Sequence, residues 1–322
     1  MWISFILLIV GLVLILLGAD ALVNGASAVA RKYGISEFVV GLTIVGIGTS
    51  APELIVSAIS AINGSSDIAI GNVVGSNISN VFMILGVTAI IAPITLTKSN
   101  LKYDLPIALG VSLLLFVLAY DSIFLGKEFN VISRWDGLIL IAMFVLFMIY
   151  SFKSSASGDQ NEESAESENG KVNIVKSVLL IVCGLVGLVL GGRLFVNSGS
   201  DIARGFGVSD AFIGITVMAV GTSLPELAAS VNAAIKKKGQ MALGNVIGSN
   251  IFNILLILGT SSIIRPLTLG GITMIDMGMM ILTTVMIMLS ALLISKKEIK
   301  RGVGALFFMI YIAYIVYLAS NL

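Results

Sequence analysis

The sequence contains no histidine, one cysteine and few charged residues, which make up 11% of its 322 residues. Without histidine, the chain lacks the commonest ligand of transition metals and the side chain that most often transfers protons near neutral pH. The single cysteine, Cys183, excludes a disulfide within the chain and lies in an apolar run typical of helix packing. A net charge of +1 gives no basic surface for nucleic acid. Any titratable function must therefore depend on carboxylates.

Apolar sequence is what the chain has in excess. It is 57% hydrophobic with a mean hydropathy of +1.06, and runs of about 20 apolar residues, the length that spans a bilayer, recur throughout. These runs do not alternate in hydrophobicity as barrel strands do. The sequence therefore predicts an all-α polytopic membrane protein with ten transmembrane helices, the first of which includes Met1 to Leu17. The expected spans cover residues 3–23, 37–62, 67–92, 103–121, 134–152, 174–198, 210–235, 240–265, 273–295 and 301–320.

The two halves of the chain are repeats of each other. Adding 173 to a residue number aligns residues 34–93 with 207–266 without a gap, and 28 of these 60 positions are identical. We expect a first five-helix repeat over residues 1–152, an acidic and flexible linker over 153–172, and a second five-helix repeat over 173–322. Internal repeats of this kind are a recurring feature of secondary transporters.

The distribution of Lys and Arg predicts the orientation of the spans. Of the 19 Lys and Arg residues, 14 fall in the odd-numbered loops. By the positive-inside rule these loops, including the linker, are cytoplasmic and both termini lie outside. Because each repeat has five spans, the second repeat enters the membrane inverted relative to the first.

One motif of each repeat places a carboxylate inside an apolar span. The first copy is Gly48-Thr49-Ser50-Ala51-Pro52-Glu53, and the second is Gly221-Thr222-Ser223-Leu224-Pro225-Glu226. The proline removes a backbone donor, so we expect the first copy to kink near 46–49 and to free carbonyl oxygens. A carboxylate at bilayer depth is costly and marks a candidate functional site.

A second motif follows in the next span of each repeat. It reads Gly-Asn-x-x-Gly-Ser-Asn-Ile-x-Asn and covers residues 71–80 and 244–253. Together the four motifs supply carboxylates, hydroxyls, amide oxygens and bare carbonyls, a donor set that suits hard cations such as Ca²⁺ and Na⁺. Two carboxylates neutralise one Ca²⁺, two Na⁺ or two protons. A site with this charge at low dielectric favours exchange over uniport.

Structural explanations compete with this interpretation. The glutamates could pair with buried bases, although no Lys or Arg is expected at their depth. The glycines and serines could serve helix packing, and asparagines could join helices; Asn72, Asn77, Asn245 and Asn250 fit that role better than Asn80 and Asn253. The lysines at 236–238 are more typical of a topology determinant than of a lipid site.

On these four motifs the sequence resembles the sodium/calcium exchanger family of the cation/Ca²⁺ antiporter superfamily, as a short member of prokaryotic type. The resemblance implies a secondary transporter rather than an enzyme, located in a prokaryotic plasma membrane, with Ca²⁺ and Na⁺ as substrates. It implies no cofactor and no obligate protein partner. It also implies that spans two, three, seven and eight form a core against which spans one and six slide.

The resemblance further implies the roles of individual residues. Glu53 and Glu226 would be the main ligands of both ions, and Thr49 and Thr222 would offer carbonyl oxygens to Ca²⁺. The remaining implied ligands are Ser50, Ser76, Ser223 and Ser249 for sodium, the carbonyls of Gly46 and Ala219, and Asn80 and Asn253 in the central site. Some relatives carry aspartate where this chain has Asn253, so potassium dependence is not expected.

The expected activity is Na⁺/Ca²⁺ exchange that exports Ca²⁺. A proton/Ca²⁺ antiporter on the same fold is the main alternative, because glutamates can carry protons. The hydroxyl ligands favour sodium. An intramembrane hydrolase with paired glutamates is disfavoured by the absence of histidine, and a passive channel by the repeats and the proline-broken helices.

Overall fold

The structure, a computed structural model, describes residues 2–124, 126, 129–156, 173–206, 221, 223–294 and 298–320. Within these residues, eight helices are long and apolar enough to span a membrane, and a bent helix pair makes a ninth candidate. Residues 210–220 and 222 of the seventh expected span, 210–235, lie outside the described residues, as does most of the expected linker. The described chain is almost entirely helical, with two short β-ribbons.

The first half contains α1 (Trp2–Tyr33), α2 (Glu37–Val40), η1 (Gly41–Val45), α3 (Gly46–Thr49), α4 (Ala51–Asn63), α5 (Ser66–Ser79), η2 (Asn80–Leu85), α6 (Gly86–Ile91), β1 (Ile94–Thr95), η3 (Asn100–Asp104), α7 (Leu105–Ala119), α8 (Asp121–Phe124), β2 (Val131–Ile132) and α9 (Arg134–Ala156). The second half contains α10 (Ile174–Gly205), α13 (Leu224–Ile235), α14 (Gly239–Phe252), η5 (Asn253–Leu258), α15 (Gly259–Ile264), β3 (Leu267–Thr268), α16 (Met274–Leu289), η6 (Ser290–Ile294), β4 (Glu298–Ile299) and α17 (Arg301–Ser320). The elements labelled η are π-helical turns.

Helices α1 and α10 are longer than the sequence predicts. The expected spans ended at residues 23 and 198, whereas α1 continues to Tyr33 and α10 to Gly205. The apolar run ends earlier, but no proline follows it, so the helix continues into polar sequence. In the first half it stops where Gly34 adopts a positive φ of 64°.

Helix α2–α3 and helix α4 meet at a bend of 46°. The break lies at Ser50, whose φ of −82° and ψ of 6° leave the helical region, and α4 then begins with Pro52 in its first turn. The expected kink over 46–49 is thus displaced by one residue, because proline is well tolerated in the first turn of the helix that follows it.

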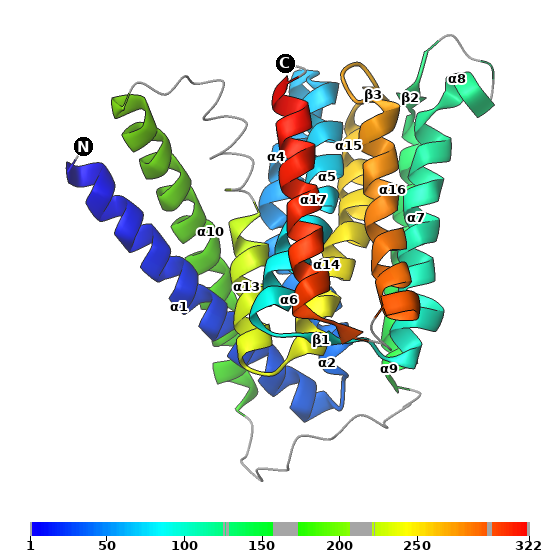
Figure 1. Cartoon of the computed structure of the whole chain (residues 1–322). Coiled ribbons are helices and arrows are strands. Elements are labelled where there is room, and N and C mark those ends of the chain that lie inside the picture. The colour runs from blue at the N-terminus through cyan, green and yellow to red at the C-terminus, as the bar shows by residue number, and fades with distance from the viewer. Residues whose placement is uncertain are drawn as a thin grey trace.

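The molecule has two parts that diverge (Figure 1). Helices α1 and α10 run side by side and lean away from a bundle formed by the remaining helices, and both chain ends lie at the same end of the molecule. The ribbons close opposite ends of the bundle. Ile94 of β1 pairs with Ile299 of β4, and Ile132 of β2 pairs with Leu267 of β3.

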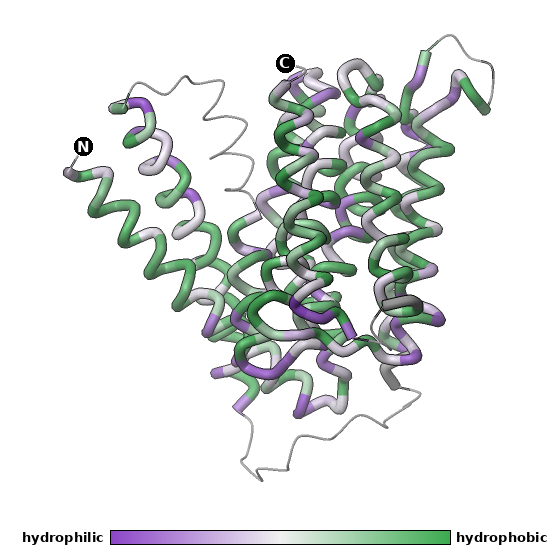
Figure 2. Tube along the Cα trace, viewed as in Figure 1, coloured by the Kyte–Doolittle hydropathy of each residue, from purple (hydrophilic) through white to green (hydrophobic). Residues whose placement is uncertain are grey.

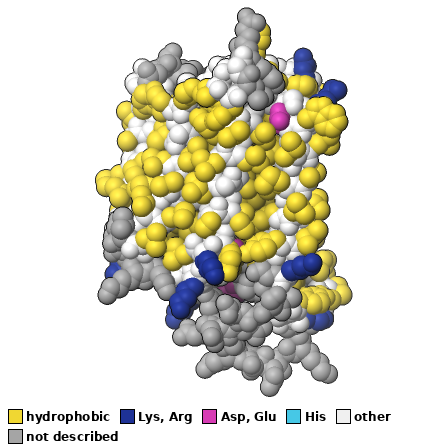
Figure 3. Space-filling view, turned by 90° about the vertical axis from the view of Figure 1, so that its right-hand side faces the viewer, with side chains coloured by type: hydrophobic (Ala, Val, Ile, Leu, Met, Phe, Trp, Pro, Cys, Tyr) yellow, Lys and Arg dark blue, Asp and Glu magenta, His cyan; other side chains and the backbone are white. Residues whose placement is uncertain are grey.

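The surface and the centre of the bundle differ in polarity. A broad band of hydrophobic side chains covers the face in Figure 3, with Lys and Arg above and below it. Hydrophilic residues also occur halfway along the central helices (Figure 2). The helical segments 66–91 and 239–264 are 78% and 94% buried in their most apolar windows, against 22% for α17. These two segments form the core that holds the candidate site.

Candidate cation site

Each motif glutamate lies in the first turn of a helix that starts in the middle of the bundle. Ser223 has φ −87° and ψ 3°, nearly the values of Ser50, and Pro225 and Glu226 follow it in α13 as Pro52 and Glu53 follow Ser50 in α4. The free N–H groups at a helix N-terminus favour negative charge there. The first turns of α4 and α13 therefore each provide a stable place for a carboxylate.

The two carboxylates are buried and close to each other. Glu53 and Glu226 are 1% and 2% exposed. Ser50 Oγ donates to Glu226 Oε1 over 3.2 Å, so a hydroxyl of the first half reaches the carboxylate of the second. Among the described residues neither glutamate forms an ion pair with Lys or Arg. This disfavours the structural explanation in which buried bases neutralise them.

The first asparagine of each second motif holds the backbone of the glutamate. Asn72 Nδ2 donates to the Glu53 carbonyl over 3.2 Å and to Ser57 Oγ over 2.9 Å. Asn245 Nδ2 makes the same pair of bonds to the Glu226 carbonyl and to Ser230 Oγ, over 3.4 and 2.9 Å. These asparagines therefore join helices, as the sequence suggested. Ser57 and Ser230 were missed, although the 173-residue offset that relates them could have revealed them.

Four further asparagines form a reciprocal network where α5 crosses α14. Asn77 Nδ2 donates to the Asn250 carbonyl over 3.2 Å, and Asn250 Nδ2 donates to the Asn77 carbonyl over 3.3 Å. Asn80 Nδ2 donates to Asn250 Oδ1 over 3.0 Å, and Asn253 Nδ2 donates to Asn77 Oδ1 over 2.9 Å. The amide nitrogens of Asn80 and Asn253 are thus used between helices, which leaves their amide oxygens as the groups that could bind a cation.

A π-helical turn begins at each of these ligand candidates. η2 starts at Asn80 and η5 starts at Asn253. Single π-turns inside α-helices occur frequently at functional sites because they change the direction of side chains locally. The same distortion at the same place in both halves argues for a functional role.

Several buried oxygens of the predicted ligands have no hydrogen-bond partner. Of the eight buried side-chain N or O atoms without a partner among the described residues, four belong to predicted ligands: Glu53 Oε2, Glu226 Oε2, Ser249 Oγ and Asn253 Oδ1. A buried polar group without a partner in a native structure points to a missing water or ion. Carboxylate, hydroxyl and amide oxygens are the ligands that Ca²⁺ and other hard cations prefer.

The other predicted ligands are placed as follows. Thr49 Oγ1 donates to the Val45 carbonyl over 3.1 Å, and the Gly46 carbonyl accepts from the Ser50 amide over 3.1 Å. The Gly46 carbonyl also accepts from Thr49 Oγ1 over 3.4 Å, a long bond with which a cation would compete. Ser76 and Ser223 are buried at 7% and 2% exposure. Thr222 and Ala219 lie outside the described residues.

Two of the three lysines after α13 form ion pairs with acidic residues. Lys236 Nζ lies 2.5 Å from Asp20 Oδ1 and donates to Asn24 Oδ1 over 2.7 Å, and Lys238 Nζ lies 3.0 Å from Glu37 Oε1. Two of the three lysines expected to set topology thus also tie α13 and the residues after it to α1 and α2.

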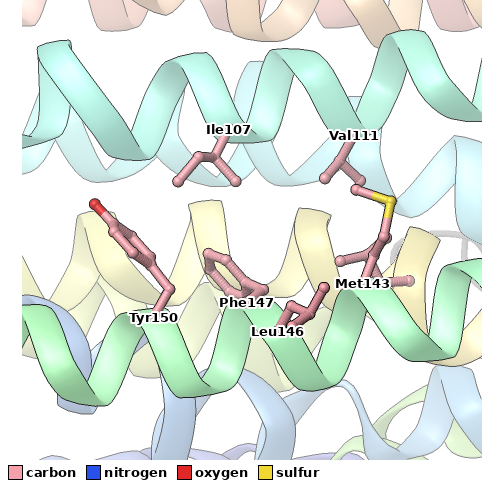
Figure 4. A pocket seen from close by; sticks show the side chains of 7 residues that line it. Ile107, Val111, Met143, Leu146, Phe147 and Tyr150 are labelled. Carbon is pink, nitrogen blue, oxygen red and sulfur yellow. The ribbon is translucent and has the colours of Figure 1, made fainter.

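An apolar cavity lies away from these oxygens, between α7 and α9 (Figure 4). Ile107, Val111, Met143 and Phe147 are among the residues that line it. None of the predicted ligands lines this cavity, so it is separate from the cation site.

The family of the chain is shown by its similarity to known proteins. The sequence model described as "Sodium/calcium exchanger protein" matches residues 3–153 and 176–319, most of the chain. The chain belongs to the sodium/calcium exchanger family. It is therefore an integral membrane protein and a cation/Ca²⁺ antiporter, and its substrates are ions.

Several relatives of this exchanger-family chain match it end to end. It is 38% identical to the putative antiporter CaxA of Alkalimonas amylolytica, with 100% of both chains covered, and 37% identical to the sodium/calcium exchanger MaX1 of Methanosarcina acetivorans, with 98% of both covered. It is 34% identical to the inner membrane protein YrbG of Escherichia coli, with 98% of both covered. A structure of the sodium-calcium exchanger NCX_Mj soaked with Na⁺ and Ca²⁺ superposes with a TM-score of 0.82 at 33% identity and covers 98% of both chains.

Proposed function

We propose that this protein exchanges Na⁺ for Ca²⁺ across a prokaryotic plasma membrane by alternating access and exports Ca²⁺. The observation that carries the proposal is the group of unpartnered buried oxygens around two carboxylates that have no basic partner among the described residues. Two negative charges match one Ca²⁺ or two Na⁺. At low dielectric these charges must be neutralised before the site can move between the two sides of the membrane.

The proposed arrangement has ten spans in two inverted five-helix repeats, over residues 1–152 and 173–322. The termini lie outside, and the linker 153–172 is cytoplasmic. The proposed ligands are Glu53, Glu226, Thr49, Thr222, Ser50, Ser223, Ser76, Ser249, Asn80, Asn253, Gly46 and Ala219. Support comes from the reciprocal bonds of the two halves, in which Asn72 and Asn245 make the same contacts.

Sodium coupling is proposed over proton coupling on the basis of the hydroxyls. Ser50, Ser223 and Ser249 are buried, Ser50 Oγ donates to Glu226 Oε1, and Ser249 Oγ has no hydrogen-bond partner among the described residues. A proton-carrying glutamate needs no further ligands, whereas a bare sodium ion needs several oxygens to replace its water. The same family includes chains named as sodium/calcium exchangers, such as MaX1.

The test is ⁴⁵Ca²⁺ uptake into liposomes that contain the reconstituted protein, driven by an outward Na⁺ gradient with pH clamped on both sides. We expect uptake that vanishes when choline replaces internal Na⁺. Uptake that ignores sodium and follows an imposed pH gradient would instead assign the protein to proton/Ca²⁺ exchange.

Substitution of either glutamate tests the site itself. Glu53→Gln or Glu226→Gln leaves one carboxylate, which cannot neutralise a divalent ion, so each change is expected to abolish Ca²⁺ uptake in the same assay. Asp67→Asn is a matched acid-to-amide control, because Asp67 binds the backbone of Gly270 and Gly271 at the bundle surface. Uptake near the wild-type rate by either glutamate variant would reject the site.

A further inference from the structure

Ser79 is a polar residue of the second motif that has no polar counterpart in the other half. The offset of 173 residues relates it to Phe252, whereas the flanking Ile78 and Asn80 correspond to Ile251 and Asn253. Phe252 packs edge-on against Phe144 with ring centroids 5.5 Å apart. The second half thus uses this position for aromatic packing, and the first half places a hydroxyl there.

The hydroxyl of Ser79 reaches the candidate cation site. Ser79 is 4% exposed, and its Oγ donates to Ser223 Oγ over 3.5 Å. Ser223 is itself 2% exposed and directly precedes α13, the helix that carries Glu226. A hydroxyl of the first repeat therefore contacts a predicted ligand of the second repeat.

This contact gives the two motif serines, Ser50 and Ser223, different hydrogen-bond partners. Ser50 Oγ donates to Glu226 Oε1 over 3.2 Å, so its proton is directed at a carboxylate. The corresponding bond would join Ser223 to Glu53, yet the described contact of the Ser223 hydroxyl is with Ser79. The two halves therefore present different hydroxyl environments to the ions.

A serine that binds a cation has to direct its proton elsewhere. The hydroxyl has one proton and two lone pairs and rotates freely to suit its neighbours. When a lone pair of Ser223 faces a cation, its proton needs an acceptor, and Ser79 Oγ is the described group within hydrogen-bond distance. Because both hydroxyls rotate, Ser223 can donate and Ser79 accept without any movement of heavy atoms.

We propose that Ser79 is a positioning residue that orients the Ser223 hydroxyl for sodium and so sets the sodium affinity of the exchanger. This inference depends on the proposed function, in which Ser223 is a sodium ligand. Calcium should depend on Ser79 much less, because the two carboxylates provide most of the attraction for a divalent ion. Substitution of Ser79 should therefore weaken the response to Na⁺ much more than the response to Ca²⁺.

The experiment compares Na⁺ and Ca²⁺ dependence of exchange in the full-length protein in liposomes. Ser79→Ala should raise the half-saturating Na⁺ concentration about fivefold, the effect of losing one hydrogen bond, and change the half-saturating Ca²⁺ concentration by less than about twofold. Ser79→Thr keeps the hydroxyl and should retain the wild-type Na⁺ response.

Two controls match these changes. Tyr314→Phe removes a hydroxyl of α17 that donates to Asp276 Oδ1 over 2.7 Å, away from the site. Ser112→Ala removes a buried hydroxyl that bonds only the Ala108 carbonyl of its own helix among the described contacts. Both should leave the Na⁺ response unchanged. Sodium-dependent thermal stabilisation in detergent gives the same comparison without transport.

The outcomes separate the inference from the function it depends on. If the wild type is driven by pH and not by sodium, the proposed function fails, and the sodium role of Ser79 fails with it. If the wild type is driven by sodium but Ser79→Ala keeps its Na⁺ response, only the inference fails. Equal weakening for Na⁺ and Ca²⁺, or no recovery in Ser79→Thr, would also overturn it, because both indicate a general packing defect.

Discussion

Two pairs of equivalent helices contact each other through different kinds of residue. α1 and α10 contact along glycines spaced seven apart, with Gly11 and Gly18 on one helix and Gly184 and Gly191 on the other. A methyl group on Gly18 would lie 2.8 Å from the Gly184 carbonyl oxygen. α5 and α14 instead meet through asparagines, which exchange hydrogen bonds across the crossing.

The difference follows from what each contact has to maintain. The glycine seam of α1 and α10 uses close van der Waals contact between backbones, which holds the two helices together without directional side-chain bonds. The asparagine crossing uses hydrogen bonds, whose strength falls steeply with distance and angle. Hydrogen bonds therefore join α5 and α14, where the ligand oxygens have to keep their positions. Van der Waals contacts join α1 and α10, the pair that diverges from the bundle (Figure 1).

Breaking the asparagine crossing should have the largest effect. Asn77→Ala removes the acceptor of Asn253 and the donor to the Asn250 carbonyl, so two buried groups lose their partners. We expect a loss of about 2–4 kcal/mol in the free energy of unfolding and of more than about tenfold in Ca²⁺ uptake. Thermal unfolding in detergent and liposome flux measure the two effects. Wild-type values for both would show that the crossing is dispensable.

Breaking the glycine seam should cost less and leave the site intact. Gly18→Leu forces a side chain against the α10 backbone and should destabilise the protein by about 1–3 kcal/mol, while the thermal shift produced by Ca²⁺ stays near that of the wild type. Gly278→Ala in α16 is the control, because nothing lies within 4 Å of its added methyl group. A weakened response to Ca²⁺ in Gly18→Leu would mean that the seam also shapes the site.

Changing the chemistry of the crossing without changing its shape should give a pH-dependent effect. Asn253 Nδ2 donates to Asn77 Oδ1, and the carboxyl introduced by Asn253→Asp can donate that bond only while it is protonated. The variant should therefore lose stability and change its transport rate as pH rises, over a range where the wild type does not. Thermal unfolding and flux across a pH series measure this. An unchanged pH profile would show that Asn253 does not line the central site.

The smallest effect is expected at the ion pairs between the two parts of the molecule. Lys236 binds Asp20 and Asn24 of α1, and its side chain is 24% exposed. Because partly exposed pairs contribute little, Lys236→Gln should change stability by less than about 1 kcal/mol. Its effect should also shrink at high salt. Lys237→Gln, whose residue forms no ion pair among the described residues, is the control. A loss of several kcal/mol in the free energy of unfolding would mean that these pairs, rather than apolar packing, attach α1 to the bundle.

Much of the site could be predicted because it is repeated. Glu53 and Glu226 stand out as acids inside apolar spans, and the constant offset relates each motif residue to its counterpart. The break at Ser50 also followed from Pro52, within one residue. The same method could not find Ser79, because its counterpart is Phe252 and a search for matching pairs discards it. The lengths of α1 and α10 were underestimated because helices continue beyond their apolar windows.

Hydrophobic runs, motif spacing and charge determined the membrane class, the family and the two carboxylates from the sequence by itself. These properties are local, because periodicity, proline and the cost of a buried charge act within a few residues. Only the tertiary structure decided which amide atoms face each other, which serine contacts Ser79 and which glycines approach a backbone. The bond from Asn253 to Asn77, for example, joins residues 176 positions apart, and such contacts depend on the rotation and register of packed helices.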